Sequence, residues 1–288
     1  MPVVPVSRWG VSARSWAVDM TSARSKRPVG ELLGDPARLH LHYGHGHPAV
    51  PYDFEDTLES WYVKVTYGMA GDEEWEDEEG EGSRAPAAGT EVGHVILWRL
   101  RDDTGDSGWE AADAESGDLE VIASAVLGRS GRAGYSAAFE KAVTHPVGDL
   151  LILDRVHLDR AWRGFGLGPI LAVEAIRRLS GGCCAVAAYP AMGEYPKDRE
   201  QVTEAYRRRA KKKIAALWES IGFQRFRRGV WLLDTALRQP EELLLARRAE
   251  LHALSAAFQR CGLSWSGPVD AVNFVEDSSE VSAGPRTI

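Results

Sequence analysis

The sequence predicts a mixed α/β fold, and three observations support this prediction. Residues 150–179 begin as an apolar run, pass through a glycine-rich turn and continue with apolar residues at helical spacing, so they predict a strand, a turn and a helix. Two earlier segments, 59–67 and 91–101, are rich in β-branched and aromatic residues and predict strands. After the central helix, residues 183–189 predict a buried strand and residues 223–234 predict a closing hairpin.

The composition is that of a soluble globular protein with one unusual tract. The 288 residues are 44% hydrophobic and 26% charged, and a chain of this length can bury a substantial core. The net charge of −8 is concentrated at residues 72–81, which predict a solvated, disordered loop; a docking site for basic partners is the alternative. The rest of the chain is nearly balanced in charge, which makes nucleic acid an unlikely main partner.

Cysteine usage and hydropathy indicate a cytoplasmic protein. Cys183 and Cys184 are adjacent, Cys261 stands alone, and no C-x-x-C spacing occurs, so we expect a reducing compartment and no zinc site. Residues 1–20 contain no apolar core of signal-peptide length, and no apolar run reaches the ~18 residues of a membrane span. We therefore expect no membrane partner.

The segment before the first predicted strand is irregular in pattern. Residues 1–35 mix Pro, Ser, Arg and Trp and predict an extended or partly ordered arm. Residues 39–48 contain four histidines and predict a polar turn. The histidines are His40, His42, His45 and His47. A metal site is the alternative, but no carboxylate or cysteine completes an obvious ligand set, so no metal is predicted.

Short helices are predicted between the strands. Residues 102–113 predict a loop, and residues 116–127 predict a helix capped by Ser116 or Asp118, with a strand as the alternative. Residues 135–143 predict a second short helix that leads towards the central strand.

Two longer helices are predicted after the central segment. Residues 197–220 predict a basic helix whose cations at 207–213 form a solvated face; binding of an anionic ligand or RNA is the alternative. Residues 240–263 carry a leucine stripe and predict a helix that covers either the sheet or a homodimer partner. Residues 276–288 predict a frayed polar tail.

The glycine turn is the strongest functional signal. Gly164, Gly166 and Gly168 remove side chains from the turn, so backbone N–H groups can approach an anion, and the following helix adds a partial positive charge. Arg163 adds a full charge at the same place. The pattern therefore predicts a phosphate or diphosphate site, although its spacing fits neither a dinucleotide-binding turn nor a P-loop.

The order Arg163-x-x-Gly166-x-Gly168 resembles the GNAT family of acyl-CoA-dependent N-acyltransferases. Residues 216–223 (ALWESIGF) resemble that family's Tyr-x-x-x-Gly-Phe signature. The resemblance covers residues 61–234 and is close only over 150–234. It implies a mostly antiparallel central sheet flanked by helices. The predicted N-terminal arm and C-terminal helix would be additions to that fold.

The resemblance also implies a division of the chain. Residues 1–55 would form a partly irregular N-terminal extension and residues 56–240 the acyltransferase domain, with a disordered acidic loop at 71–90. Residues 241–288 would form the C-terminal helix and a flexible tail.

The family's site residues map onto named positions here. The pantetheine arm of the coenzyme would lie along Val156, His157 and Leu158. Its diphosphate would be held by Arg163, Gly164, Phe165, Gly166, Leu167 and Gly168. Asp154 is the first candidate for the general base, because a titratable residue at this position sometimes has that role in the family; a strand carboxylate paired with Arg155, Arg160 or a neighbouring strand is the alternative. His157 is the second candidate: the ordinary pKa of histidine suits proton transfer, but strand alternation turns this side chain to the face opposite Asp154.

The chain departs from the family pattern at two places. Trp218 stands where many relatives have the tyrosine that protonates the departing thiolate, and an indole N–H can donate a hydrogen bond but cannot act as a useful acid. Ala188, Tyr189 and Pro190 occupy a region in which relatives often carry asparagine.

The sequence therefore predicts an enzyme that transfers an acyl group from acetyl-CoA, or another acyl-CoA, to an amine. The acceptor, a small molecule or a protein amine, is not specified by any motif. One alternative is an inactive acyl-CoA-binding scaffold, which Trp218 would suit. The other is a nucleic-acid-associated module that uses residues 207–213.

Overall fold

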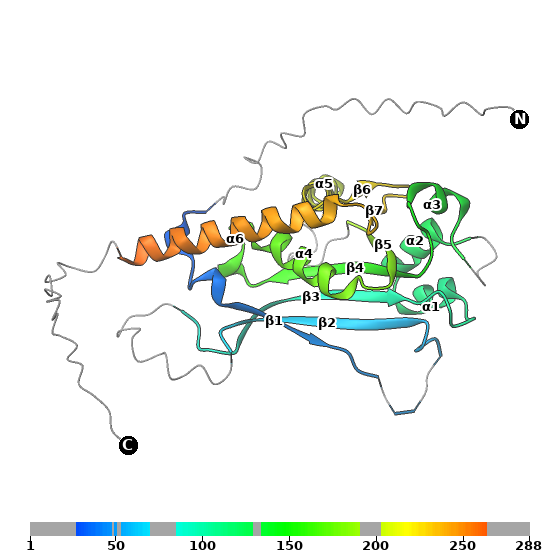
Figure 1. Cartoon of the computed structure of the whole chain (residues 1–288), viewed down its shortest axis with the longest axis horizontal. Helices are drawn as coiled ribbons and strands as arrows, with labels where there is room; N and C mark the ends of the chain where they lie inside the picture. Colours follow the sequence, from blue (N-terminus) through cyan, green and yellow to red (C-terminus); the bar gives the residue numbers. More distant parts are fainter. Residues whose placement is uncertain are drawn as a thin grey trace, which may run out of the picture.

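The computed structural model describes residues 27–47, 49–50, 53–69, 85–128, 134–190 and 203–263 (Figure 1). The predictions made for residues 1–26, for the acidic tract at 72–81 and for the tail at 276–288 lie outside the described residues.

A seven-stranded sheet forms the centre of the described fold, in the order β1-β2-β3-β4-β5-β7-β6. The strands are β1 (Leu39–Gly44), β2 (Leu58–Tyr67), β3 (Thr90–Leu100), β4 (Asp149–Leu158), β5 (Cys183–Ala188), β6 (Gln224–Arg225) and β7 (Trp231–Asp234). Every neighbouring pair is antiparallel except β4 and β5, which are parallel. The predicted mixed α/β class with a mostly antiparallel sheet is thus confirmed.

Helices cover both faces of the sheet (Figure 1). The helices are α1 (Gly108–Glu115), α2 (Gly117–Val126), α3 (Ala137–Ala142), α4 (Leu167–Leu179), α5 (Glu204–Ser220) and α6 (Gln239–Leu263). Apolar residues of α1, α2 and α3 pack with Leu150 and Ile152 on one face of β4. Residues of α4, α5 and α6 pack with Leu151 and Leu153 on the other. Strand alternation therefore gives β4 a core on each side.

Most predicted elements are confirmed, with shifted ends. The helix predicted at 116–127 is α2, capped by Ser116, whose hydroxyl accepts a hydrogen bond from the Leu119 N–H at 3.3 Å. This settles the choice between Ser116 and Asp118 and excludes a strand. The hairpin β6–β7 turns through Arg228 and Gly229, both of which have positive φ.

Two predictions about local structure are wrong. The loop predicted at 102–113 contains α1, because Ser107 caps this helix by accepting from the Glu110 N–H. Ser107 and Glu110 form the S-x-x-E spacing of a capping box, a signal present in the sequence. The polar turn predicted at 39–48 contains β1, which pairs with β2 along its whole length. There Leu39, Leu41 and Tyr43 alternate with histidines and pack on the core.

A third apolar cluster lies where the glycine turn meets the sheet. Trp162 is 1% exposed, lies 5.6 Å from the Tyr67 ring and packs with Phe165 and Leu167. It forms part of a single 3₁₀ turn (Arg160–Trp162) between β4 and α4. This indole therefore fixes the turn to the body of the protein.

We expect Trp162→Ala to lower the free energy of unfolding by about 3–5 kcal/mol, the usual loss when a buried tryptophan is truncated. Chemical denaturation measures the change, with Trp162→Phe as the control that retains most of the apolar contact. A loss below about 1 kcal/mol for the alanine variant would contradict the assigned anchoring role.

Candidate functional site

The parallel strands β4 and β5 separate halfway along β4. Their pairing runs from Asp149 opposite Cys183 to Leu153 opposite Ala188, where β5 ends. Strand β4 continues to Leu158 and pairs only with β3 over that stretch. The backbone edge of β4 beyond Leu153 therefore has no strand partner on the β5 side within the described sheet. An extended ligand with amide groups can bind such an edge as an added strand would.

A β-bulge marks the point of separation. Leu153 pairs with Leu97 and Arg155 pairs with Ile96, so Asp154 is an extra residue with no counterpart on β3. Leu153 before the bulge and Val156 after it pack in the same cluster, although they lie three positions apart. The bulge therefore changes which face each later residue of β4 uses.

The bulge places the Asp154 carboxyl in a partly buried position. Burial raises the pKa of Asp154 above its ordinary value, and the Asp118 carboxyl on α2 raises it further. The Arg155 charge and the Trp98 indole lower this pKa by favouring the carboxylate. The Trp98 Nε1 is buried and makes no hydrogen bond of ordinary geometry with any described residue. An aspartate of raised pKa binds a proton more readily than an exposed aspartate does.

His157 lies in a row of aromatic rings. Its ring stacks on His94 at 4.9 Å between centroids, and His94 stacks on Tyr62 at 5.1 Å. Burial, and next the neighbouring His157, lower the pKa of His94. The Tyr62 hydroxyl donates to Glu91 at 2.7 Å, and His157 lies 3.8 Å from the Asp159 carboxylate.

The expected opposition of Asp154 and His157 is wrong. On β3, which runs through this region with no extra residue, Trp98 and His94 are separated by an even number of positions and share a face. Asp154 interacts with Trp98, and His157 stacks on His94. The additional residue in β4 breaks the alternation and brings both side chains to the face that α1 and α2 cover further along.

The glycine turn has the backbone that its sequence predicts. Gly164 and Gly166 have φ of 91° and 82°, in the left-handed region that favours glycine. Gly166 is the N-cap of α4, and no side chain caps this helix. The first N–H groups of α4 are therefore without a side-chain acceptor from the cap, and the helix dipole adds partial positive charge there.

The turn is tied to the end of β4. The Arg163 Nε donates to the Leu158 carbonyl, and Phe165 and Leu167 are buried in the cluster of Trp162. A Cβ added to Gly168 would lie 3.9 Å from Val156, so the start of α4 lies beside the edge of β4. The structure thus brings Val156, Leu158 and the whole turn together, as predicted.

Trp218 joins this region from α5. Its side chain is 4% exposed and packs in the cluster that contains Val156 and Ala188, one residue from each separated strand. Its indole N–H is buried, and no acceptor for it lies among the residues that the structure describes. A buried donor without an acceptor is uncommon and is suited to a ligand.

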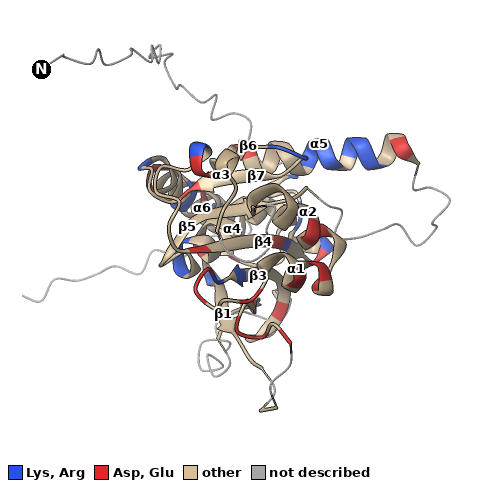
Figure 2. Ribbon diagram, turned by 90° about the vertical axis from the view of Figure 1, so that its right-hand side faces the viewer, with Lys and Arg blue, Asp and Glu red and all other residues tan. Residues whose placement is uncertain are grey.

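The cations of α5 lie towards the N-terminal end of this helix, whereas Trp218 lies near its C-terminal end. Arg207, Arg208, Arg209, Lys212 and Lys213 are exposed where α5 extends beyond the sheet (Figure 2). Lys211 also donates to the Tyr189 hydroxyl at 2.9 Å, directly after β5.

The sequence did not identify Trp98 or Asp118 as neighbours of Asp154, because these contacts depend on how the strands and helices pair in the folded protein.

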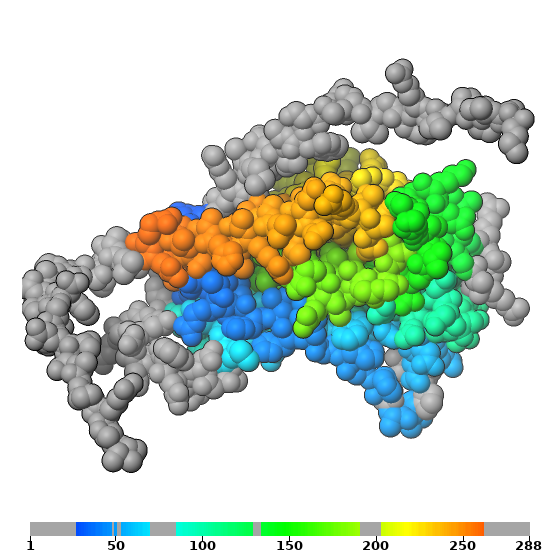
Figure 3. Space-filling view, in the orientation of Figure 1, coloured from blue at the N-terminus to red at the C-terminus, as the bar shows by residue number. Residues whose placement is uncertain are grey.

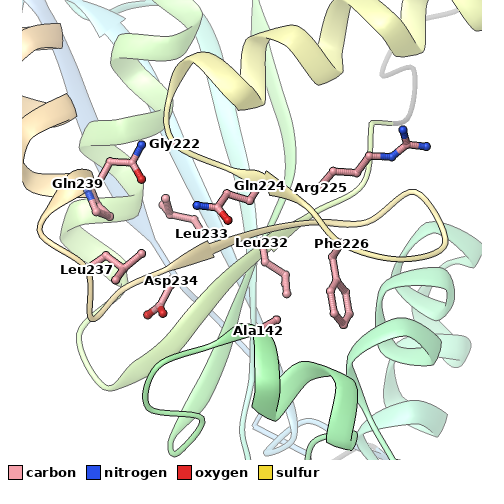
Figure 4. A pocket seen from close by; sticks show the side chains of 11 residues that line it. Ala142, Gly222, Gln224, Arg225, Phe226, Leu232, Leu233, Asp234, Leu237 and Gln239 are labelled. Atoms are coloured by element: carbon pink, nitrogen blue, oxygen red, sulfur yellow. The ribbon is translucent and has the colours of Figure 1, made fainter. Parts of the chain in front are cut away.

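Two hollows lie away from the β4 edge. A cavity of about 340 Å³ between α4 and α6 is lined mainly by aliphatic residues such as Ile176 and Leu244. A smaller cavity of about 80 Å³ lies beside β6 and β7 (Figure 4). There the Asp234 carboxylate accepts from the N–H and the hydroxyl of Thr144, so Asp234 has a structural role.

Among the described residues, no group of three or more His, Cys, Asp or Glu side chains is arranged to hold a metal ion. None of the helices in the described ranges combines the length and apolar character that a membrane span requires.

Fold and site together define an α/β protein with an opened parallel strand pair, a bulged central strand and a glycine turn at the start of a helix. No family model and no curated protein matches the chain. Three solved structures are similar to it at low identity. A tyrosine-to-phenylalanine mutant of KacT is 14% identical, with a TM-score of 0.31 over 66% of this chain and 78% of that one.

The KacTA–DNA complex is 12% identical, with a TM-score of 0.33 over 72% of this chain and 99% of that one. A tyrosine-to-phenylalanine mutant of the AtaT toxin bound to the C-terminus of the antitoxin AtaR is 10% identical. Its TM-score is 0.30, over 72% of this chain and 97% of that one.

We expect Asp154→Asn to stabilise the folded protein at neutral pH. Because the folded-state pKa of Asp154 lies above its ordinary value of 3.8, the native state binds more protons than the unfolded state between these two pKa values. The free energy of unfolding of the wild type therefore falls as the pH rises through that interval, and the asparagine variant escapes this loss.

Urea denaturation across a pH series measures the effect, with Asp113→Asn on an exposed position of α1 as the control for loss of a surface charge. Parallel pH profiles for the wild type and Asp154→Asn would contradict the raised pKa.

Proposed function

We propose that this protein is an N-acyltransferase that moves an acetyl or other acyl group from acyl-CoA directly to an amine. The observation that carries the proposal is the course of β4. One strand loses its parallel partner at a bulge, presents a backbone edge, and then runs into a glycine turn at the start of a helix. This arrangement suits a ligand with an extended amide-containing arm and a diphosphate, which is the chemistry of coenzyme A.

The coenzyme would bind along these elements in order. The amides of the pantetheine arm would pair with the backbone of β4 between Val156 and Leu158, beyond the end of its pairing with β5. The diphosphate would accept hydrogen bonds from backbone N–H groups between Gly164 and Gly168, supported by the dipole of α4 and by Arg163. The thioester would then lie near the bulge, where Asp154 and Trp218 approach from the two faces of the sheet.

Asp154 is the proposed general base. An ammonium acceptor must lose a proton before its nitrogen can attack, and a carboxylate of raised pKa can accept that proton. The nitrogen then forms a bond to the thioester carbon, and the carbon–sulfur bond breaks with its electron pair on sulfur. The second proton on nitrogen leaves to solvent as the amide forms.

Trp218 has a separate proposed role at the leaving group. Its N–H donates a hydrogen bond and does not transfer a proton, so it would stabilise sulfur as a thiolate. A thiolate is a fair leaving group because the pKa of a thiol is about 8.5. The tyrosine of the resembling family is thus replaced by a donor that keeps its proton.

The basic end of α5 supports a second candidate, a nucleic-acid-associated module. Six cations lie within seven positions at 207–213, and all six are exposed. The steep salt dependence of nucleic-acid binding distinguishes this function from coenzyme binding. An RNA-binding isotherm that does not respond to salt would remove the second candidate.

We expect Arg163→Glu to weaken coenzyme A binding by at least about tenfold. The change removes one charge-assisted contact, which contributes about 1.5–3 kcal/mol, and places a negative charge beside the diphosphate. Isothermal titration calorimetry measures the affinity. Arg178→Glu makes the same charge change on an exposed position at the other end of α4 and is the matched control. Equal affinities for the two variants would contradict the diphosphate assignment.

We expect Asp154→Asn to lower kcat/KM for thiol release from acetyl-CoA by about 10²–10⁴-fold, the usual contribution of a general base. The wild-type rate should rise with pH through the raised pKa of Asp154, and this limb should vanish in the variant. The assay uses a panel of small amines and peptide N-termini. Tight coenzyme binding without turnover of any amine would instead support an inactive acyl-CoA-binding protein.

A further inference from the structure

A guanidinium from the N-terminal segment lies against the glycine turn. The Arg27 Nη1 is 3.3 Å from each of three carbonyl oxygens, those of Arg160, Ala161 and Arg163. The guanidinium also lies 4.8 Å from the centre of the Phe165 ring. These residues stand more than 130 positions from Arg27 in the chain. The contacts therefore join two distant segments at the predicted diphosphate site.

We propose that Arg27 is a positioning residue for the diphosphate turn, and that it couples docking of the N-terminal segment to coenzyme binding. The inference rests on the proposed function, because it assigns the turn to the coenzyme diphosphate. It adds a residue that lies outside the glycine motif.

The peptide between Arg163 and Gly164 shows how Arg27 acts on the turn. In a planar trans peptide, the C=O and the following N–H point in opposite directions. The Arg163 carbonyl faces Arg27, so the Gly164 N–H is directed away from Arg27. Arg27 thus holds one face of the turn by its carbonyls, and the first amide of the predicted cradle is presented on the other.

Gly164 is required for this approach as well as for the backbone conformation. A Cβ added at Gly164 would lie 3.0 and 3.1 Å from two carbons of the Arg27 side chain, closer than ordinary van der Waals contact. A side chain at Gly164 would require the Arg27 side chain to shift by a few tenths of an ångström. Glycine at this position therefore serves two requirements at once.

The segment that carries Arg27 is itself docked. Arg27 pairs with Glu31 at 2.9 Å, and Leu32, 3% exposed, packs in the cluster of Trp162 and Phe165. The Gln259 amide of α6 donates to Asp35 at 2.9 Å. In Figure 3, α6 (orange) lies against the blue surface of this segment. Residues 27–38 thus lie between the turn and α6.

The proposal requires that docking of residues 27–38 and binding of the coenzyme each strengthen the other. If the docked segment orders the turn and the ordered turn binds the diphosphate more tightly, the coenzyme must stabilise docking by the same factor. Coenzyme binding should therefore slow amide exchange in residues 27–32, even where these residues do not touch it.

The test compares coenzyme A affinity by calorimetry in the full chain. Arg27→Ala should weaken binding about tenfold. Arg27→Lys should remain weak, because one ammonium on a flexible stem does not present the planar guanidinium that reaches three carbonyls and stacks on Phe165. Arg38→Ala is the matched control. It removes a guanidinium that stacks on Tyr67 at 5.0 Å in the same segment, and it should bind like the wild type.

Hydrogen exchange supplies a readout that a purely structural role would not move. Coenzyme A should slow exchange at residues 27–32 in the wild type and should not do so in Arg163→Glu. Wild-type affinity in Arg27→Ala, together with weakened binding in Arg163→Glu, would overturn this inference and leave the proposed function standing. Absence of coenzyme binding by the wild type would overturn both.

Discussion

The arrangement of the site depends on one extra residue in the central strand. Without Asp154, β4 would keep its alternation and its pairing geometry to its end. With it, the strand bends, and the residues after the bulge change faces relative to those before it. The bulge coincides with the last paired residue of β5, so the sheet opens at the point where the strand is distorted. Opening and bulge together expose backbone groups that a regular sheet would bury.

In the proposed function, coenzyme binding and proton transfer use different parts of the same strand, β4. Beyond the bulge, Leu158 and the glycine turn pack against buried aromatic residues. At the bulge, Asp154 is partly buried, and this burial raises the pKa of its carboxyl. Under the proposed function, β4 would hold the diphosphate-binding turn and the proton acceptor Asp154 at a fixed separation, as transfer between two bound partners requires.

The sequence predicts what depends on local pattern. The strand, turn and helix between Asp149 and Leu179 follow from periodicity and from glycine, and the structure confirms them. The faces of Asp154 and His157 could not be predicted, because a bulge is a relation between two strands and leaves no mark in either one. The contact of Arg27 with Arg163 could not be predicted from the sequence either, because 136 positions separate the two residues. In contrast, helix α1 could have been predicted, because Ser107 and Glu110 form a capping box in the sequence.

The indole of Trp218 places a hydrogen-bond donor inside the apolar cluster between the two separated strands. A buried donor left without an acceptor costs about 1–3 kcal/mol. Among the described residues, none accepts from this N–H. A ligand that places sulfur or a carbonyl oxygen there would recover this cost on binding. A tyrosine hydroxyl at this position could transfer its proton to the departing sulfur, whereas an indole N–H can only donate a hydrogen bond to it. Under the proposed function, tryptophan in place of the tyrosine of the resembling family would favour departure of sulfur as an anion, and proton transfer would then take place on the amine side, where Asp154 lies.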